Sequence, residues 1–187
     1  KSRSSVLYEI IILNSRKYAI ISFLLRKSIE IKSIILYQLG ALNAFCRANG
    51  TTLSYVKPHG ALYNMAAKDF ELAYTLTQSV KEIDANLSFF GLPHSEMEKA
   101  SNKSALQFIG EAFADRTYQN DGSLTPRSQS NALIESESVA IEQVLQIIKS
   151  RTVTSLFGNR IPLPAETICI HGDGKHAVLF AASLYKK

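Results

Sequence analysis

The side chains best suited to chemistry gather in three short clusters along the sequence. The first holds Lys57 and His59, the second Glu111, Asp115 and Arg116, and the third His171 and Asp173. Histidine titrates near neutral pH, and a carboxylate can orient a histidine, bind a cation or act as a base. Lysine and arginine can hold an anion or stabilise developing negative charge. The three clusters therefore suit acid–base chemistry or metal binding.

Each cluster also has a structural interpretation. A histidine after a strand is often a hydrogen-bonded loop residue, Asp115 and Arg116 can form a surface ion pair, and Asp173 can cap the last helix. His94 and His176 have no polar cluster beside them, and we expect structural roles for both. The coincidence of three clusters raises the odds of a functional site.

The clusters follow short apolar runs that are typical of buried strands. These runs are Leu53–Val56, Leu106–Ile109 and Thr167–Ile170, and Leu87–Phe90 is a further run of the same kind. In parallel α/β folds the carboxyl ends of the strands form the ligand crevice. Polar residues placed just after each strand are therefore expected to converge there.

Helical patterns separate these strands. The first helix is predicted from residue 28 to the Asn49-Gly50 stop. Two further helices are predicted, one after a cap at Asp69 and one that begins with Ser95 and Glu98. A fourth helix is predicted through Ile141 and Ile148, and a fifth through Phe180 at the C-terminus. Asn120-Asp121-Gly122 and Phe157-Gly158-Asn159 predict two hairpin-like turns. Alternating strands and helices favour a parallel α/β fold, and an open sheet and a barrel both fit this order.

The composition excludes several function classes. Residues 1–50 carry a net charge of +6 and residues 51–187 a net charge of −1, so the body lacks the basic face of a nucleic-acid binder. No apolar stretch is long enough to cross a membrane. Cys46 and Cys169 indicate free thiols of a reducing compartment, so we expect a cytoplasmic protein. Glycine-rich phosphate loops, CxxC and HExxH motifs are absent from the sequence.

Residues 1–27 form an atypical N-terminal segment. Its apolar runs, Val6–Leu13 and Tyr18–Leu25, are each too short to span a bilayer. The second run has some features of a signal peptide but lacks a small-residue cleavage site. Two buried strands, or one strand and one helix, both fit the segment.

Three strings resemble the LamB/YcsF family. They are Val56-Lys57-Pro58-His59-Gly60-Ala61-Leu62-Tyr63-Asn64, then Glu111-Ala112-Phe113-Ala114-Asp115-Arg116-Thr117-Tyr118 with its continuation through Arg127, then Ile170-His171-Gly172-Asp173. The resemblance runs in the same order from residue 28 to the C-terminus. It implies a single β/α domain over residues 28–187, built as a seven-stranded β/α barrel of the glycosidase and deacetylase type.

The resemblance also implies an activity. The family supplies the A-type component of ATP-dependent 5-oxoprolinase, which hydrolyses the cyclic amide of 5-oxo-L-proline to L-glutamate with cleavage of ATP. The expected ligands are thus 5-oxo-L-proline, ATP and a divalent cation such as Mg²⁺, and the expected partners are the B-type and C-type subunits. A nucleic acid or a membrane is not an expected partner.

The matching positions give the expected site. Lys57 and Arg116 would bind anionic groups, His59 or Asp115 would act as base or cation ligand, and His171 with Asp173 would form an oriented pair. Tyr63, Glu111 and Arg127 lie within the matching strings and are expected to bind substrate.

Residues 1–27 depart from the family. Its members carry an N-terminal region with an acidic strand and further histidines, which has no counterpart in this segment, so the first strands of the barrel are expected to be missing. Two alternatives follow. One is an inactive remnant that still binds a partner subunit, and the other is a metal-dependent deacetylase or amidase on the same type of barrel.

Overall fold

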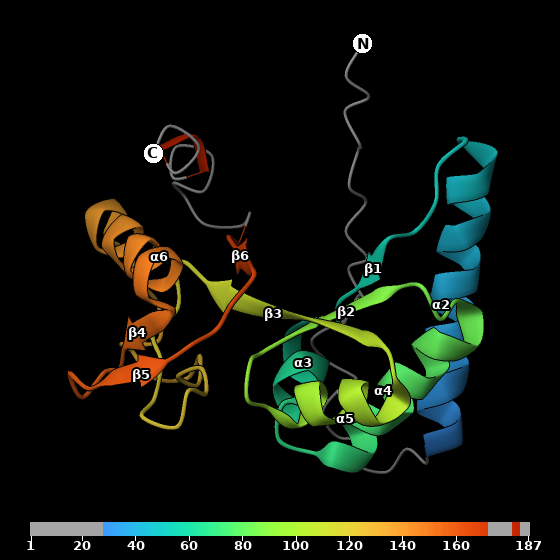
Figure 1. Ribbon diagram of the computed structural model, residues 1–187, viewed down its shortest axis with the longest axis horizontal. Helices are drawn as coiled ribbons and strands as arrows, with labels where there is room; N and C mark the ends of the chain where they lie inside the picture. The colour runs from blue at the N-terminus through green and yellow to red at the C-terminus, as the bar shows by residue number, and fades with distance from the viewer. Residues whose placement is uncertain (1–27, 172–180, 184–187) are drawn as a thin grey trace. The chain divides into compact units, whose positions relative to one another are not determined.

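A computed structural model describes residues 28–171 and 181–183 (Figure 1). The expectations for residues 1–27 and for Asp173 therefore fall outside the described residues. The described chain divides into two compact units. One contains the residues up to Gly91 together with Ser95–Ile109, and the other contains Leu92–His94 and the residues from Gly110 onward.

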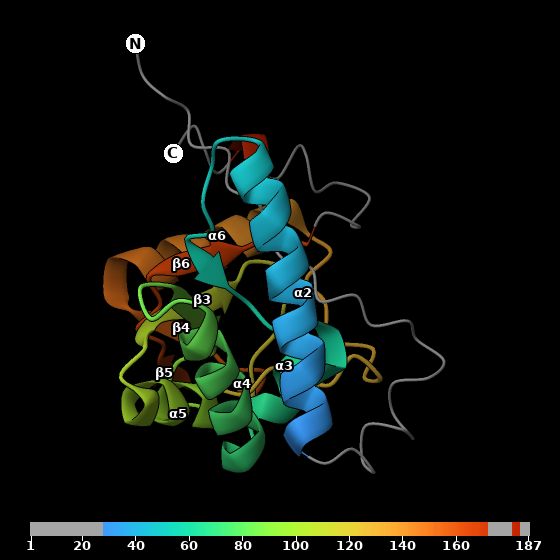
Figure 2. The same cartoon turned by 90° about the vertical axis from the view of Figure 1, so that its right-hand side faces the viewer.

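Within the described residues, the first unit contains four helices and two strands. They are α2 (Ser28–Ala48), β1 (Tyr55–Val56), α3 (Gly60–Ala66), α4 (Phe70–Ile83), β2 (Ser88–Gly91) and α5 (Glu96–Ser104). Strand β1 pairs with β2 in parallel. Helix α4 contacts both α2 and α5, and the turned view shows α2 running along the side of the unit (Figure 2).

Local signals explain where the helices of this unit begin and end. The Asp69 side chain accepts a hydrogen bond from the Leu72 backbone N–H at 3.0 Å and caps α4. Ser95 caps α5 in the same way, through the N–H of Met97 at 3.2 Å. Helix α2 ends before Gly50, whose φ of +67° is a conformation that glycine adopts readily. These predicted helices are confirmed.

Helix α3 is the element that the sequence did not predict. Gly60 has a φ of +62°, so the chain turns sharply at this glycine after β1. A helix of seven residues begins there, with His59 at its N-cap. A helix this short offers too few positions for a helical period to be recognised.

Among the described residues, the second unit contains the remaining strands and one long helix. They are β3 (Gln107–Phe113), whose first residues belong to the first unit, then α6 (Glu137–Ser150), β4 (Thr152–Thr154), β5 (Arg160–Pro162) and β6 (Thr167–Cys169); residues 181–183 are helical. Strands β4 and β5 form the predicted antiparallel hairpin. The predicted turn before Gly122 is also present, with an antiparallel bridge between Tyr118 and Leu124.

Strand β3 pairs with β6. The two strands are parallel, with Glu111 opposite Thr167 and Phe113 opposite Cys169. The backbone N–H of Ala114 donates to the Cys169 carbonyl at 3.0 Å, which extends the pairing by one residue. The residues that follow the two strands therefore leave the sheet at the same edge.

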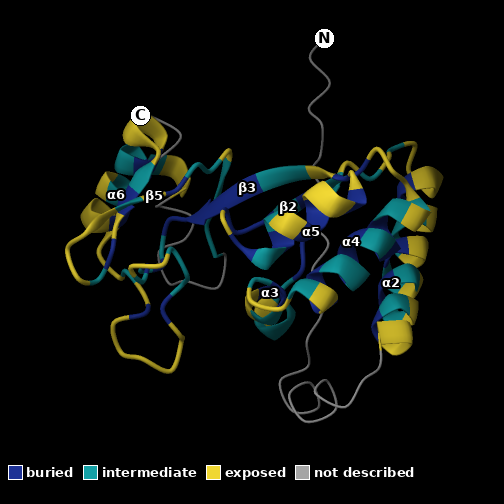
Figure 3. Ribbon diagram, turned by 60° about the horizontal axis from the view of Figure 1, so that its bottom comes forward, coloured by how far each residue is buried: buried dark blue, intermediate teal, exposed yellow. Residues whose placement is uncertain are grey.

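The core of this region lies between α6 and the two strands. Ala114, Ala140 and Val144 are buried together, and four isoleucines pack against them: Ile134, Ile141, Ile168 and Ile170. The buried residues of α6 are Ala140, Val144 and Ile147, whereas Ile148, part of the predicted helical pattern, is 63% exposed. Figure 3 shows exposed and less exposed residues along this helix.

The strands are hydrogen-bonded in the order β1-β2-β3-β6. Together with the intervening helices they confirm the predicted mixed α/β class with parallel strands. Cys46 and Cys169 are free thiols. Within residues 28–171 and 181–183, no helix is long and apolar enough to cross a membrane.

Candidate functional site

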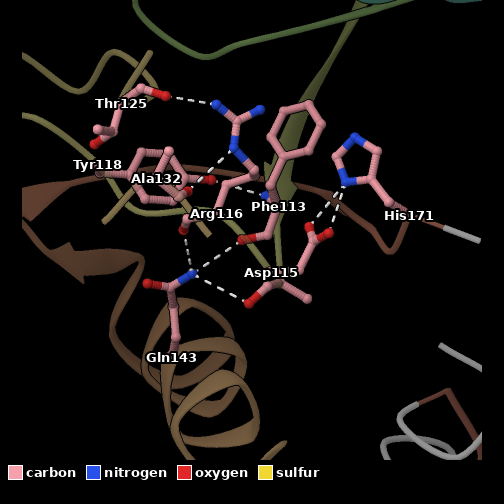
Figure 4. A network of polar contacts seen from close by, with 9 residues as sticks. Phe113, Asp115, Arg116, Tyr118, Thr125, Ala132, Gln143 and His171 are labelled. Carbon is pink, nitrogen blue, oxygen red and sulfur yellow. Dashed lines mark hydrogen bonds and ion pairs between the residues drawn. The ribbon is translucent and has the colours of Figure 1, made fainter. Parts of the chain in front are cut away.

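Asp115 and His171 form an acid–histidine pair at the carboxyl end of β3 and β6. His171 Nδ1 lies 2.9 Å from Oδ1 and 2.8 Å from Oδ2 of Asp115 (Figure 4). A carboxylate only accepts, so Nδ1 carries the hydrogen and donates it. The other ring nitrogen, Nε2, is then the basic one. Both side chains are about one-fifth exposed, at 19% for His171 and 22% for Asp115, so the pair is accessible to a small molecule.

The environment keeps Asp115 ionised. Burial by itself would raise its pKa, but the hydrogen bond from His171, the charge of that histidine and the nearby Arg116 act in the opposite direction and prevail. The pKa of Asp115 therefore lies below its ordinary value.

The ring of Phe113 stacks against the imidazole of His171. The ring centroids are 5.6 Å apart and the planes differ by 19°. Phe113 is the last residue of β3, and its side chain is buried. The imidazole is therefore fixed in its plane by Phe113 and in its rotation by Asp115.

Arg116 is buried and holds the loop that follows β3. Its Nη2 donates to the carbonyl of Thr125 at 2.6 Å, and its Nε donates to the carbonyl of Ala132 at 3.3 Å. Burial and the charge of nearby Arg127 both lower the pKa of the Arg116 guanidinium. Arg127 itself is exposed on the same loop. The expected role of Arg116 and Arg127 toward anions stays a prediction beside this structural role.

Tyr118 and Glu111 are both buried, and the charge of Glu111 acts on Tyr118. The Tyr118 hydroxyl accepts a hydrogen bond from the Phe113 backbone N–H at 2.8 Å. Burial, with the nearby charge of Glu111 adding to it, raises the pKa of Tyr118, so the phenol stays neutral. Glu111 is 3% exposed.

The other predicted site residues of the described chain belong to the first unit. Lys57 directly follows β1 and is buried, His59 is the partly buried N-cap of α3, and Tyr63 is buried on α3. Their participation in one site with Asp115 and His171 stays a prediction. The partner expected for His171 was Asp173, which lies outside the described residues; the structure gives His171 a partner in Asp115.

Two residues that contact the site were not singled out from the sequence. Tyr118 lies inside a string that resembles the family, but nothing in its spacing indicates a contact with the strand end. Gln143 on α6 donates to backbone carbonyls around Asp115, and the helical pattern places it only beside the apolar face. No local sequence signal reports such a contact across 27 to 30 positions.

Metal binding was the alternative use for these groups. Among the described residues, no three histidine, cysteine or acidic side chains converge as a metal site.

Parallel strands alternating with helices, with an acid–histidine pair just past two adjacent strands, define a class of α/β proteins that bind or convert small molecules at that edge. The model of the LamB/YcsF family matches residues 24–187. The chain therefore belongs to the LamB/YcsF family, and the resemblance of its three strings is confirmed.

Named relatives support the same assignment. The chain is 49% identical over 158 residues to the 5-oxoprolinase A-type subunit of Bacillus subtilis (strain 168), a match that covers 84% of the chain and 62% of the relative. It is 49% identical over 155 residues to the corresponding 5-oxoprolinase component of Tolumonas auensis, covering 83% and 62%. The lactam utilization protein of Thermus thermophilus has a similar structure, with a TM-score of 0.80, 34% identity, and coverage of 86% of the chain and 65% of that protein.

The chain thus spans a little over three-fifths of the length of these relatives.

Proposed function

We propose that this chain is an A-type component of an ATP-dependent 5-oxoprolinase, which hydrolyses the cyclic amide of 5-oxo-L-proline to L-glutamate with cleavage of ATP to ADP and phosphate. The names of the relatives, at 49% identity, support the substrate and the multi-subunit setting. The observation in the structure that carries the proposal is the Asp115–His171 pair, because hydrolysis needs an oriented base for water.

The geometry supports a path for the proton. Asp115 holds Nδ1–H, so Nε2 of His171 accepts a proton from water as the water oxygen attacks the carbonyl carbon of the ring. The ring C–N bond then breaks, and the nitrogen takes up a proton to become the amine of glutamate. Asp115 stabilises the imidazolium in between.

An unstrained lactam is a poor electrophile, and this is the proposed reason for the use of ATP. Transfer of the γ-phosphoryl group from ATP to the amide oxygen would release ADP and make the ring carbon reactive. Water adds to that carbon, and cleavage of the ring C–N bond leaves the ring-opened chain as an acyl phosphate. A second water then hydrolyses the acyl phosphate to glutamate and inorganic phosphate. Cations near these oxygens stabilise the charge. Lys57 and Arg116 are proposed for this role, and His59 as a second base or cation ligand.

The other residues expected at the site, and the divalent cation, also have proposed roles. Tyr63, Glu111 and Arg127 are proposed to bind substrate, and Asp173 to assist His171. A divalent cation such as Mg²⁺ would be held mainly by the phosphates of ATP, as such ions commonly are, since the described residues do not form a metal site of their own.

The proposal also includes the barrel, the partner subunits and the cellular location of this chain. The parallel strands are proposed to form part of a seven-stranded β/α barrel. Activity is proposed to require B-type and C-type subunits. A cytoplasmic location would suit the free thiols of Cys46 and Cys169.

The test measures ATP-dependent release of glutamate from 5-oxo-L-proline by the chain assembled with its partner subunits. The variant His171→Asn removes the base, and we expect kcat to fall about 10²–10⁴-fold. His94→Asn is the matched control, because His94 is exposed and has a φ of +63°, which asparagine tolerates.

Three other outcomes of this experiment would contradict the proposal or favour an alternative function. Full activity of His171→Asn would remove the pair from the mechanism. Binding of the partner subunits without glutamate release would favour the inactive remnant. Amide hydrolysis that needs an added metal ion but no ATP would favour a deacetylase or amidase.

A further inference from the structure

Gln143 lies on α6 directly beneath the turn that carries Asp115. Its side-chain nitrogen, Nε2, is 3.0 Å from the carbonyl oxygen of Phe113, 2.9 Å from that of Arg116 and 3.4 Å from that of Ala114 (Figure 4). These three carbonyls bracket Asp115 on both sides along the chain. A single side chain thus binds the backbone before and after the acid.

The side-chain amide of Gln143 has enough N–H groups to make the two short hydrogen bonds. A carboxamide has two N–H hydrogens, and the two short distances, to Phe113 and Arg116, use one hydrogen each. Strand β3 stops pairing with β6 just past Phe113, because the chain turns there. The backbone carbonyls of this turn therefore need hydrogen-bond donors from outside the sheet. Gln143 supplies such donors.

Helix α6 ties Gln143 to both halves of the pair. Its neighbour Val144 is buried against Ala114, and Ile168 and Ile170 of the β6 segment pack on the same cluster. The residues next to Asp115 and next to His171 therefore rest on the helix that carries Gln143. Displacement of the turn relative to α6 would move the Asp115 carboxylate relative to the imidazole.

We propose that Gln143 is a positioning residue that holds the Asp115 turn in place, so that both carboxylate oxygens face Nδ1 of His171. Its importance for catalysis rests on the proposed function, whereas its effect on the histidine does not. The orientation of the imidazole should then depend on a side chain that touches neither the histidine nor the substrate.

The experiment compares two methionine variants of the full chain. Gln143→Met keeps the length and helix propensity of glutamine but removes the donor. Gln146→Met makes the same change three residues later on α6, where Gln146 contacts Thr152 and Thr154 and not the Asp115 turn. The hydrogen bonds of both glutamines reach residues outside the helix, so each variant loses contacts of the same kind.

The primary readout is the position of the hydrogen on the His171 ring. Nitrogen-15 correlation spectra distinguish Nδ1–H from Nε2–H, and the signals of His171 are those that disappear in His171→Asn. In the parent chain and in Gln146→Met, we expect the Nδ1–H form. In Gln143→Met, we expect a mixture in which the Nε2–H form, favoured by a free imidazole, becomes substantial.

The second readout is steady-state kinetics in the assembled enzyme. A positioning residue should affect kcat more than KM, and we expect Gln143→Met to lower kcat about 10–100-fold while Gln146→Met stays near the parent value. If the parent assembly shows no glutamate release, the proposed function fails, and the spectra still decide the role of Gln143.

An unchanged Nδ1–H form in Gln143→Met would overturn the proposal, as would an equal change in Gln146→Met. Cooperative thermal unfolding verifies that each variant is folded. If Gln143→Met does not fold, Gln143→Asn retains the amide with a shorter reach, and the same mixture is expected. Failure of both to fold, with Gln146→Met folded, would show that the amide is needed for folding and not for positioning.

Discussion

Asp115 meets His171 through both carboxylate oxygens, although 56 positions separate the two residues in the chain. Phe113 fixes the plane of the imidazole, and Gln143 binds the backbone on both sides of the acid. The pair is therefore supported from a strand and a helix, and not by loop residues alone. Such support is what keeps a base oriented between turnovers.

The variant Asp115→Asn tests the charge of the pair at the residue scale. Asparagine keeps the shape but cannot stabilise an imidazolium, so we expect a loss of kcat of about 10³–10⁴-fold in the assembled enzyme. Glutamate release assays measure this. A loss of less than about threefold would show that the carboxylate has no catalytic part.

The same variant makes a prediction about stability and pH. The pKa of Asp115 is lowered in the fold, so its ionised form stabilises the folded state above the ordinary carboxyl pKa of about 3.9. That contribution is lost as the pH falls through the lowered pKa. Urea unfolding should therefore show the largest gap between the parent chain and Asp115→Asn near neutral pH, and a smaller gap at about pH 3.

The sequence identified Asp115 and His171 as candidate site residues, but it did not predict that they contact each other. Asp115 and His171 were both singled out because each follows an apolar strand. Asp173 was the expected partner of His171, since it is close in sequence, whereas the partner that the structure shows is Asp115. That pairing depends on the register of β3 and β6, which no local pattern reveals.

At the scale of elements, burial against neighbours decides where strands end. The third predicted strand, Leu106–Ile109, continues in the structure to Phe113. Gly110 and Glu111 interrupt the apolar run, and for that reason the predicted strand ended too early. A side chain at Gly110 would lie 3.0 Å from the carbonyl oxygen of Pro164, so the glycine allows the close approach of a neighbouring segment and does not end the strand.

Helix α2 has two different faces, and this gives a prediction at the element scale. Leu39 is fully buried, and Leu39→Ala should cost about 2–5 kcal/mol of unfolding free energy. Tyr37, on the other face, is 78% exposed, and Tyr37→Ser should change stability by about 0.5 kcal/mol or less. Urea unfolding of both variants provides the measurement. Equal costs would mean that the outer face of α2 is covered in solution.

At the scale of the whole molecule, the chain is a member of a family whose named relatives are longer. Its described part contains two compact units with their own buried side chains, and each holds some of the predicted site residues. The proposed function requires the full chain to bind ATP and 5-oxo-L-proline. Ligand binding to the full chain tests this requirement directly.

Thermal unfolding in the presence and absence of ATP–Mg²⁺ and 5-oxo-L-proline measures that binding. A ligand at 100 times its dissociation constant stabilises the folded state by about 2.7 kcal/mol. For a chain of this size we expect a rise in Tm of roughly 5–10 °C. A cooperative transition without a shift would indicate a folded chain that lacks the complete site.

The side chain of Arg116 reaches backbone carbonyls 9 and 16 positions further along the chain. Few of the residues between Arg116 and Ala132 lie in regular strands or helices. The two hydrogen bonds of the Arg116 guanidinium hold this segment against the end of β3. The segment cannot open one peptide at a time without breaking those charged hydrogen bonds. Its protected backbone amides should therefore exchange their hydrogens for deuterium as a group, at the rate of a shared opening, as a small folding unit does.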